Sequence, residues 1–261
     1  MAYTYAEERE GDVVKSWNDS SLNKNVSEIA EKLQISSKGY KAFKFGRNGQ
    51  STTPFWHRFK TKKDTAKTDI EFKSGSDSIT MSIKEDKSCW MSGARDETLA
   101  TLFSAVKECP ELQETNEFNN LLNTIDDFDS VVVEGNVNEN LKLGNSEICY
   151  LDDVHKRFMD DINDMFKKYP EFGHAFIIEA ITGWNKFGFG NKASANYVGI
   201  LSKQSDYVSV YDMNCPSDRN YLTDLNKIRL QARFKSTSIK ESGSKTGQYR
   251  CWSVFSLITK Y

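Results

Sequence analysis

The sequence predicts an α/β (α+β) fold in which helices flank a central mixed β-sheet, with a helical insertion and a β-rich C-terminal part. Three observations support this prediction. Residues 67–84, "KTDIEFKSGSDSITMSIK", contain two strand-like runs joined by a polar loop, and helical patterns stand before and after them. The middle of the chain is acidic and has helical spacing. Strand-like runs return after residue 200.

Each helix beside the hairpin has a start signal and an apolar stripe. In residues 25–34, Asn25 is a candidate cap, and apolar side chains recur at helical spacing from Val26 to Leu33. After the hairpin, Asp96 is a candidate cap for a second helix with the same spacing. Helix, strands and helix in this order make a small α/β unit.

The rest of the chain divides by character into further elements. In chain order, we expect helices at 116–125, 152–169 and 174–183 and strands at 130–135, 207–212, 227–235 and 251–258, with a flexible connection at 241–248. These elements indicate three segments: an α/β core at 1–110, an acidic helical region at 111–172, and a C-terminal helix with strands at 173–261.

Composition limits the classes of function. No apolar run approaches the roughly 20 residues of a membrane-spanning helix. The N-terminus has no basic segment followed by an apolar one, and the five cysteines are scattered, so we expect a cytoplasmic protein without membrane contact. The histidines are isolated, and "GFGNKAS" matches neither a Walker loop nor a dinucleotide fingerprint, so no small organic cofactor is expected.

The formal net charge of −2 hides a strong pattern. Residues 38–67 carry nine Lys or Arg against one acid, and residues 227–250 carry seven against one. Between them, residues 108–171 carry sixteen acids against five bases. The two basic segments can build one positive face for a polyanion, although each alone is equally explained as a solvated surface.

The hairpin at 67–84 places carboxylates beside an amine. Side chains alternate between faces along a strand, so pairing the two apolar faces puts four polar residues on one face: Asp69, Glu71, Ser82 and Lys84. A carboxylate such as Asp69 can hold Mg²⁺, and a lysine can orient or deprotonate an attacking water, provided their functional atoms lie within about 8 Å. The simpler alternative is an exposed ion pair across two strands.

These residues resemble a known family. An aspartate at a strand start, a short loop and a strand ending in acid-x-Lys, between two helices, is similar to the PD-(D/E)XK restriction-endonuclease-like nucleases. The motif here is Thr68 and Asp69, followed by the Ser-x-Lys of Ser82 and Lys84. Thr68 replaces the family's proline, which is often absent, and Ser82 replaces the second acid and so removes a metal ligand. The resemblance covers about residues 25–107 and implies a restriction-endonuclease-like core.

The resemblance also implies which other residues complete the site. In some Ser-x-Lys members an acid has moved to the next helix, where Glu97 stands, so Asp69 and Glu97 would bind Mg²⁺ or Mn²⁺. Glu28 and Glu31 on the preceding helix match the position of an accessory acid. The candidate catalytic residues are therefore Asp69, Lys84, Glu97, Ser82, Glu28 and Glu31.

The implied function is that of a Mg²⁺-dependent endodeoxyribonuclease, which would hydrolyse phosphodiester bonds in double-stranded DNA and leave a 5′-phosphate. A homodimer would suit the cutting of both strands. The run from Lys67 to Phe103 also resembles phage-encoded nuclease-like proteins, which would place the protein in the cytoplasm of a host cell. The alternative is a non-catalytic nucleic-acid-binding or phage structural protein that keeps a degraded nuclease fold, since Ser82 replaces an acid.

A second constellation follows the same order in the C-terminal part. Glu179 on a helix, Asp212 at a strand end and Lys235 on a strand form a rival catalytic set. Gln231 or Arg233 stands where an acid is expected, but Gln231 lies four residues before Lys235 rather than two.

The strand at 227–235 also has a polar row. Arg229, Gln231, Arg233 and Lys235 alternate with apolar residues, and such a row can contact phosphates and base edges. It is equally explained as a solvated face. Together with the basic segment before the hairpin, this row provides the candidate nucleic-acid-binding residues: Lys60, Lys62, Lys63, Arg229, Arg233 and Lys235.

Overall fold

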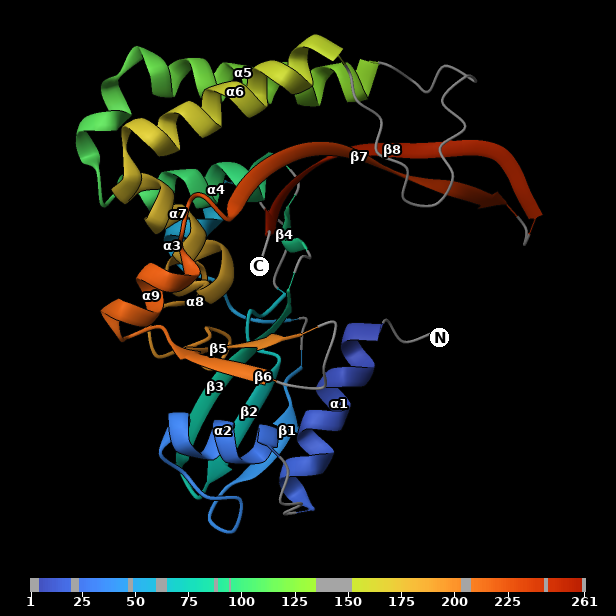
Figure 1. Cartoon of the computed structure of the whole chain (residues 1–261). Helices are drawn as coiled ribbons and strands as arrows, with labels where there is room; N and C mark the ends of the chain where they lie inside the picture. Colours follow the sequence, from blue (N-terminus) through green and yellow to red (C-terminus); the bar gives the residue numbers. More distant parts are fainter. Residues whose placement is uncertain are drawn as a thin grey trace.

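The computed structural model describes residues 5–19, 24–46, 49–59, 65–86, 89–93, 95–134, 152–202, 208–241 and 244–259 (Figure 1). Only the backbone is described for residues 5–7, 89, 92–93, 127–134, 152–159, 229, 231–241 and 244–259. The helices are α1 (Tyr5–Asn18), α2 (Lys24–Leu33), α3 (Pro54–His57), α4 (Arg95–Val106), the 3₁₀ helix Pro110–Glu114, α5 (Asn116–Glu134), α6 (Asp152–Lys168), α7 (Pro170–Thr182), α8 (Trp184–Phe187) and α9 (Pro216–Leu222). The strands are β1 (Lys41–Lys44), β2 (Ile70–Ser74), β3 (Asp77–Glu85), β4 (Cys89–Gly93), β5 (Tyr197–Leu201), β6 (Val208–Asp212), β7 (Ile228–Glu241) and β8 (Ser244–Thr259). None of the described helices is long and apolar enough to span a membrane.

Five strands form one mixed sheet in the order β1-β2-β3-β5-β6. Neighbouring strands run antiparallel except β3 and β5, which are parallel. A parallel pair needs a crossover connection, and here the chain passes through β4 and helices α4 to α8 before it returns as β5 (Figure 1). The central mixed sheet flanked by helices that the sequence predicts is therefore present. It takes strands from both the 1–110 and the 173–261 segments.

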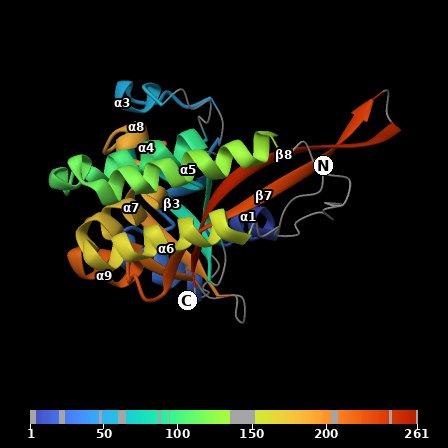
Figure 2. The same cartoon turned by 90° about the horizontal axis from the view of Figure 1, so that it is seen from above.

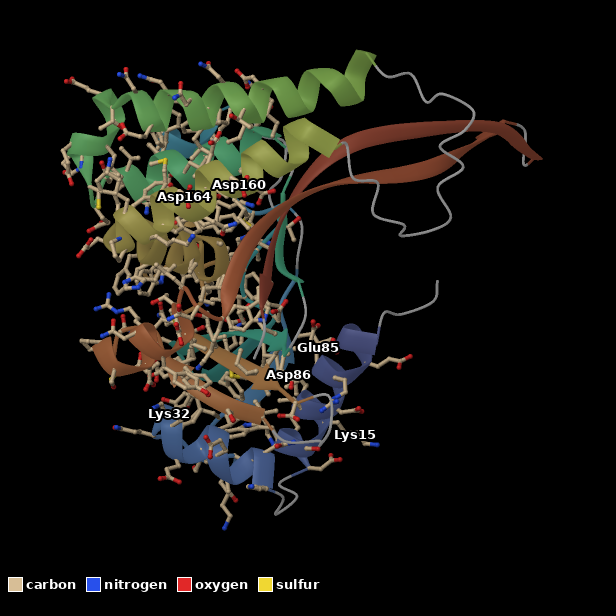
Figure 3. The ribbon with its side chains drawn as sticks, turned by 45° about the horizontal axis from the view of Figure 1, so that its top comes forward. Lys15, Lys32, Glu85, Asp86, Asp160 and Asp164 are labelled. Atoms are coloured by element: carbon tan, nitrogen blue, oxygen red, sulfur yellow. The ribbon has the colours of Figure 1, made fainter. Side chains whose placement is uncertain are left out.

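Helices cover both faces of this sheet. On one face, α1 and α2 pack on an apolar cluster that includes Ile83. On the other face, α4, α5, α6 and α7 bury a larger apolar cluster. Figure 3 shows the two sides, because Lys15 and Lys32 mark α1 and α2 on one side, and Asp160 and Asp164 mark α6 on the other.

A second, smaller sheet has the order β4-β8-β7. Strands β7 and β8 form a long antiparallel hairpin, and β4 pairs with the end of β8 between Phe255 and Ile258. Figures 1 and 2 show the hairpin leaving the body of the molecule as a curved two-stranded arm. At the base of the arm, near α5 and α6, Ile228 and Leu230 are buried.

Two predicted local elements are wrong. The expected strand at 130–135 is helical through Glu134, because α5 continues to that residue and packs along α6. A run of β-branched residues favours a strand only weakly, so tertiary packing overrides it here. The expected flexible connection at 241–248 is mostly strand, because β7 runs to Glu241 and β8 begins at Ser244.

The mixed sheet also has neighbours and contacts that the sequence patterns did not indicate. Helix α1 packs on β1, and β5 enters the sheet beside β3. Asn25 was expected to cap α2 but lies inside this helix. Its Oδ1 instead accepts a hydrogen bond of 2.8 Å from the Val208 N–H, which ties α2 to the edge strand β6.

Candidate active site

The polar face predicted for the hairpin lies on β2 and β3. Asp69 immediately precedes β2, and its N–H donates to the Met81 carbonyl oxygen at 2.9 Å. The register pairs Ile70 with Met81, so Asp69 stands level with Ser82. Met81 belongs to the cluster under α1 and α2. Because side chains alternate along a strand, Ser82 and Lys84 lie on the opposite face.

The Asp69 carboxylate is held by its neighbours on β3. Its Oδ2 accepts hydrogen bonds from Ser82 Oγ at 3.1 Å and from the Ile83 N–H at 2.7 Å. Lys84 Nζ lies 3.8 Å from the same oxygen. Of the two charged side chains, 12% of Asp69 and 15% of Lys84 is exposed. The structure therefore brings Asp69, Ser82 and Lys84 together at a place that solvent still reaches.

Glu71 lies further along β2, in a separate polar cluster. Its carboxylate accepts a hydrogen bond from Ser78 Oγ at 2.6 Å and pairs with Lys73 at 3.1 Å and Lys192 at 3.2 Å. Burial alone would raise the pKa of Glu71, but these three partners outweigh it and hold the pKa below its ordinary value. Glu71 is therefore engaged by its own set of donors.

Glu97 stands in the first turn of α4, where it pairs with a lysine from α8. Lys186 Nζ lies 3.1 Å from Glu97 Oε1, and the two side chains are 1% and 6% exposed. The same ammonium lies 5.5 Å from the ring centroid of Trp56 and 5.1 Å from that of Phe187. The acid that was expected to complete a metal site is therefore already neutralised by a buried cation.

Glu179 on α7 is also buried near this ion pair. Its Oε2 accepts hydrogen bonds from the Asn185 N–H at 2.7 Å and Nδ2 at 3.1 Å, and its Oε1 accepts one from the Lys186 N–H at 3.0 Å. The carboxylate thus satisfies the free N–H groups at the start of α8. Burial nevertheless raises the pKa of Glu179 above its ordinary value.

Lys67 belongs to the same region and was missed by the sequence reasoning. Its N–H donates to the Ala193 carbonyl oxygen at 2.9 Å. Its side chain passes close to Gly183, where an added Cβ would lie 2.7 Å from Lys67 Cγ. The available signal was its position, two residues before Asp69 in the stretch already singled out.

The charge of Lys67 is affected both by the buried Glu97–Lys186 pair with Glu179 and by Lys84 of the Asp69 cluster. Burial lowers the pKa of Lys67 to about 8. The carboxylates of Glu97 and Glu179 oppose this shift, and the ammonium groups of Lys186 and Lys84 add to it. The charge of Lys67 therefore interacts with the buried Glu97–Lys186 pair and with Lys84 beside Asp69.

Other predicted residues lie on the opposite face of the sheet. Glu28, Glu31 and Asp212 line a surface pocket of about 430 Å³ between α2 and β6. Val210, in the same pocket, belongs to the cluster under α1 and α2. The structure therefore places Glu28 and Glu31 with Asp212 rather than with Asp69. Of the rival set, Glu179 lies with Lys186, while Asp212 lies in this separate pocket.

The candidate nucleic-acid-binding residues fall in two places. Three of them lie outside the described residues: Lys60, Lys62 and Lys63. The other three lie on the arm strand β7, where only their backbone is described: Arg229, Arg233 and Lys235.

The resemblance implies a divalent metal ion, and Asp69 and Glu97 are the residues proposed to hold it. Within the described ranges, no three or more His, Cys, Asp or Glu side chains are grouped so that they could hold an ion. Magnesium is commonly bound through only one or two carboxylates, with water and phosphate oxygens as its other ligands. Asp69 provides one partly accessible carboxylate, and Glu97 is paired with Lys186. The site therefore fits an ion held mainly by Asp69, not a cage of protein ligands.

Comparisons with known proteins gave one similar structure. No family model matches this chain. No curated protein matches it either. Among solved structures, restriction endonuclease MspI in complex with its cognate DNA is similar, with a TM-score of 0.41 and 10% sequence identity over 88% of this chain and 76% of that chain.

Proposed function

We propose that this protein is a metal-dependent endonuclease that hydrolyses phosphodiester bonds in double-stranded DNA. The proposal is carried by the Asp69 carboxylate, which lies 3.8 Å from Lys84 Nζ on the neighbouring strand. Hydrogen bonds from Ser82 and the Ile83 N–H fix this carboxylate. An ordinary surface ion pair is exposed and held loosely, whereas this one is mostly buried and oriented on a rigid sheet.

Each residue has a distinct role in the proposed reaction. Asp69 would hold Mg²⁺ or Mn²⁺, and the bound ion would offset charge on the phosphate and lower the pKa of its water. Lys84 would orient the attacking water or accept its proton, and would face the negative charge that develops on the phosphate. Ser82 would keep Asp69 Oδ2 in position, and Glu97 would hold Lys186. The expected product carries a 5′-phosphate.

The arm formed by β7 and β8 is the proposed DNA-contacting element. Residues 227–250 carry seven bases against one acid, and the arm leaves the body of the molecule (Figures 1 and 2). A two-stranded β-ribbon fits the major groove of DNA, and lysine and arginine neutralise phosphates. Dimerisation, a cytoplasmic location and a phage origin stay predictions.

The test is cleavage of supercoiled plasmid with Mg²⁺ or Mn²⁺. Lys84→Ala and Asp69→Asn should each reduce the rate at least about 100-fold, since general acid–base and metal-binding groups contribute on that scale. Lys73→Ala is the matched control, because Lys73 is a half-exposed lysine of β2 paired with Glu71. It should cut at close to the wild-type rate.

Two other outcomes would redirect the proposal. Loss of cleavage in Lys235→Ala together with wild-type cleavage in Lys84→Ala would remove Lys84 from the proposed mechanism and leave Lys235 as the lysine that cleavage needs. Binding of DNA without cleavage in either metal would favour the non-catalytic nucleic-acid-binding protein. The serine at position 82 and the Glu97–Lys186 pair at 3.1 Å favour this second candidate, because both leave the site one acid short.

A further inference from the structure

A pocket of about 440 Å³ lies on the same sheet as the candidate active site and has no part in the chemistry proposed above. It opens between the ends of β3 and β5, strand β6 and helix α9. Its volume falls within the roughly 300–1,000 Å³ of small-molecule sites. The polar and aromatic residues that line it are Asp86, Ser202, Ser209, Tyr211, Tyr221 and Lys227.

Two tyrosines and a lysine form one wall of the pocket. Tyr211 from β6 and Tyr221 from α9 are stacked, with ring centroids 5.2 Å apart and planes 12° from parallel. Lys227 Nζ lies 4.6 Å from the Tyr221 ring centroid and 3.5 Å from Asp224 Oδ2, and Tyr221 is 47% exposed. A base that stacks on Tyr221 would take the place of this ammonium on the ring. Nucleobases stack on aromatic rings, and ammonium groups pair with phosphates. This wall therefore suits a nucleotide better than a purely apolar ligand.

The opposite side of the pocket is polar. Ser202 and Ser209 provide hydroxyl groups that can donate or accept hydrogen bonds. Asp86 provides a carboxylate, which can accept from an exocyclic amino group of a base but would repel a phosphate. A nucleotide is therefore expected with its base edge toward Asp86 and its phosphate toward Lys227.

The register connects this pocket to the candidate active site. Lys84 on β3 pairs with Ile200 on β5, and Ile200 pairs with Ser209 on β6. Paired residues share a face of the sheet, and neighbouring strands are about 4.8 Å apart, so Lys84 and Ser209 are separated by about 10 Å. Measured along the helix axis of stacked DNA, that distance corresponds to at most about three nucleotides at 3.4 Å each. One strand could therefore reach both places.

We propose that this pocket holds an unpaired nucleobase of the DNA strand whose phosphate lies at Asp69 and Lys84. The location of the phosphate rests on the proposed function, whereas the affinity of the pocket for a base does not. The base must be unpaired, because a base inside a duplex has its faces covered and must leave the stack before a side chain can stack on it. Gapped or mismatched DNA should therefore bind better than an intact duplex.

The test measures binding without cleavage. A duplex with a short gap carries 2-aminopurine, a fluorescent base, at positions one to five from the gap edge, and the full chain is added in EDTA. The wild-type protein should quench the fluorescence of 2-aminopurine at one of these positions. Tyr221→Leu should lose the quenching and bind the gapped DNA roughly 5- to 150-fold more weakly, the range expected for one stacked base. Tyr221→Phe keeps the ring and should keep both signals.

Two further variants make the result decisive. Phe43→Leu removes an aromatic residue that is 48% exposed on β1, away from the pocket, and should bind like wild type. Ser209→Tyr fills the pocket but leaves both tyrosines, and should bind as weakly as Tyr221→Leu. Wild-type binding by Ser209→Tyr, or equal weakening by Phe43→Leu, would overturn the proposal.

The same measurements separate this proposal from the nuclease. Normal quenching in EDTA with no cleavage in Mg²⁺ or Mn²⁺ would sink the endonuclease and support the base pocket. Cleavage by wild type, with unchanged affinity for gapped DNA in both pocket variants, would sink the base pocket alone. Near-ultraviolet circular dichroism identifies a variant that has lost its fold. If Tyr221→Leu does not fold, the binding of Ser209→Tyr decides the test.

Discussion

Lys186 Nζ lies 3.1 Å from Glu97 Oε1, and both side chains are almost fully buried. The pair joins α8 to the first turn of α4 across 89 positions of sequence. Removing a charge from water costs several kcal/mol per ion, so each of these charges is tolerated only because the other is present. Two further residues enclose this pair. Glu179 accepts a hydrogen bond from the Lys186 N–H, and the Trp56 ring centroid lies 5.5 Å from Lys186 Nζ.

Lys186→Met should lower the free energy of unfolding by roughly 3–5 kcal/mol, because it leaves the Glu97 carboxylate buried without its cation. The double variant Lys186→Met with Glu97→Leu should recover most of this loss, since it removes both charges. Urea denaturation of the two variants measures the difference. The control is Lys168→Met, which breaks the exposed pair with Glu117, where the side chains are 56% and 48% exposed.

That control should cost less than about 1 kcal/mol, as exposed pairs do. Equal losses in Lys186→Met and Lys168→Met would contradict the burial argument. A double variant no more stable than Lys186→Met would show that packing, rather than the orphaned carboxylate, sets the cost.

Glu179 should make the protein less stable as pH rises. Burial raises its pKa above the ordinary 4.5, so the folded chain binds this proton more strongly than the unfolded chain does. The contribution of Glu179 is fully present below pH 4.5 and is lost as pH rises through the folded-state pKa. The free energy of unfolding of wild type, minus that of Glu179→Gln, should therefore fall as pH rises above about 4.5.

Urea denaturation at several pH values measures this difference. Glu171→Gln controls for the removal of one charge, because Glu171 is an exposed acid on the same helix. A difference that rises with pH would mean that the hydrogen bonds from Asn185 and Lys186 outweigh burial in setting the pKa of Glu179.

Gly183→Ala should cost more stability than Gly75→Ala. Both glycines have left-handed backbones, with φ of +68° and +58°, and such a conformation costs a non-glycine residue about 1–2 kcal/mol. At Gly75 nothing lies within 4 Å of an added Cβ, whereas at Gly183 Lys67 Cγ would lie at 2.7 Å. Thermal unfolding of both variants measures the extra loss, and equal losses would show that Lys67 moves aside freely.

Asp69, Ser82 and Lys84 could be predicted together because they belong to one hairpin. Strand alternation and the apolar pattern of Ile70 and Met81 determine which side chains share a face, and the register follows from the same pattern. Strands β2, β3 and β6 of the mixed sheet were predictable for a similar reason, since they read as short alternating runs, whereas β1 and β5 were not predicted as strands. Local pattern was sufficient wherever the contact itself is local.

Lys67, Glu179 and Lys186 could not be assigned to the site in the same way. Lys186 lies in the four-residue helix α8, which has no periodicity of its own, and its partner Glu97 lies 89 positions earlier. Such contacts depend on the crossover that brings α7 and α8 back over the sheet. Glu28 shows the converse, because its helix was predicted correctly but covers the opposite face.

Mn²⁺ should stabilise the protein through Asp69. A ligand at ten times its dissociation constant raises the free energy of unfolding by about 1.4 kcal/mol, so the melting temperature of wild type should rise with Mn²⁺. Asp69→Asn should show no rise in melting temperature with Mn²⁺, because an amide keeps the shape of the side chain but not its charge. Asp164→Asn is the control, since Asp164 is 75% exposed and Figure 3 shows it on α6, well separated from Glu85 at the end of β3. Lys84→Ala should keep the rise while losing cleavage, because the lysine is proposed to act on water and phosphate rather than to hold the ion. An equal rise in wild type and Asp69→Asn would remove Asp69 as the metal ligand, and with it the part of the proposed mechanism that depends on an ion at that carboxylate.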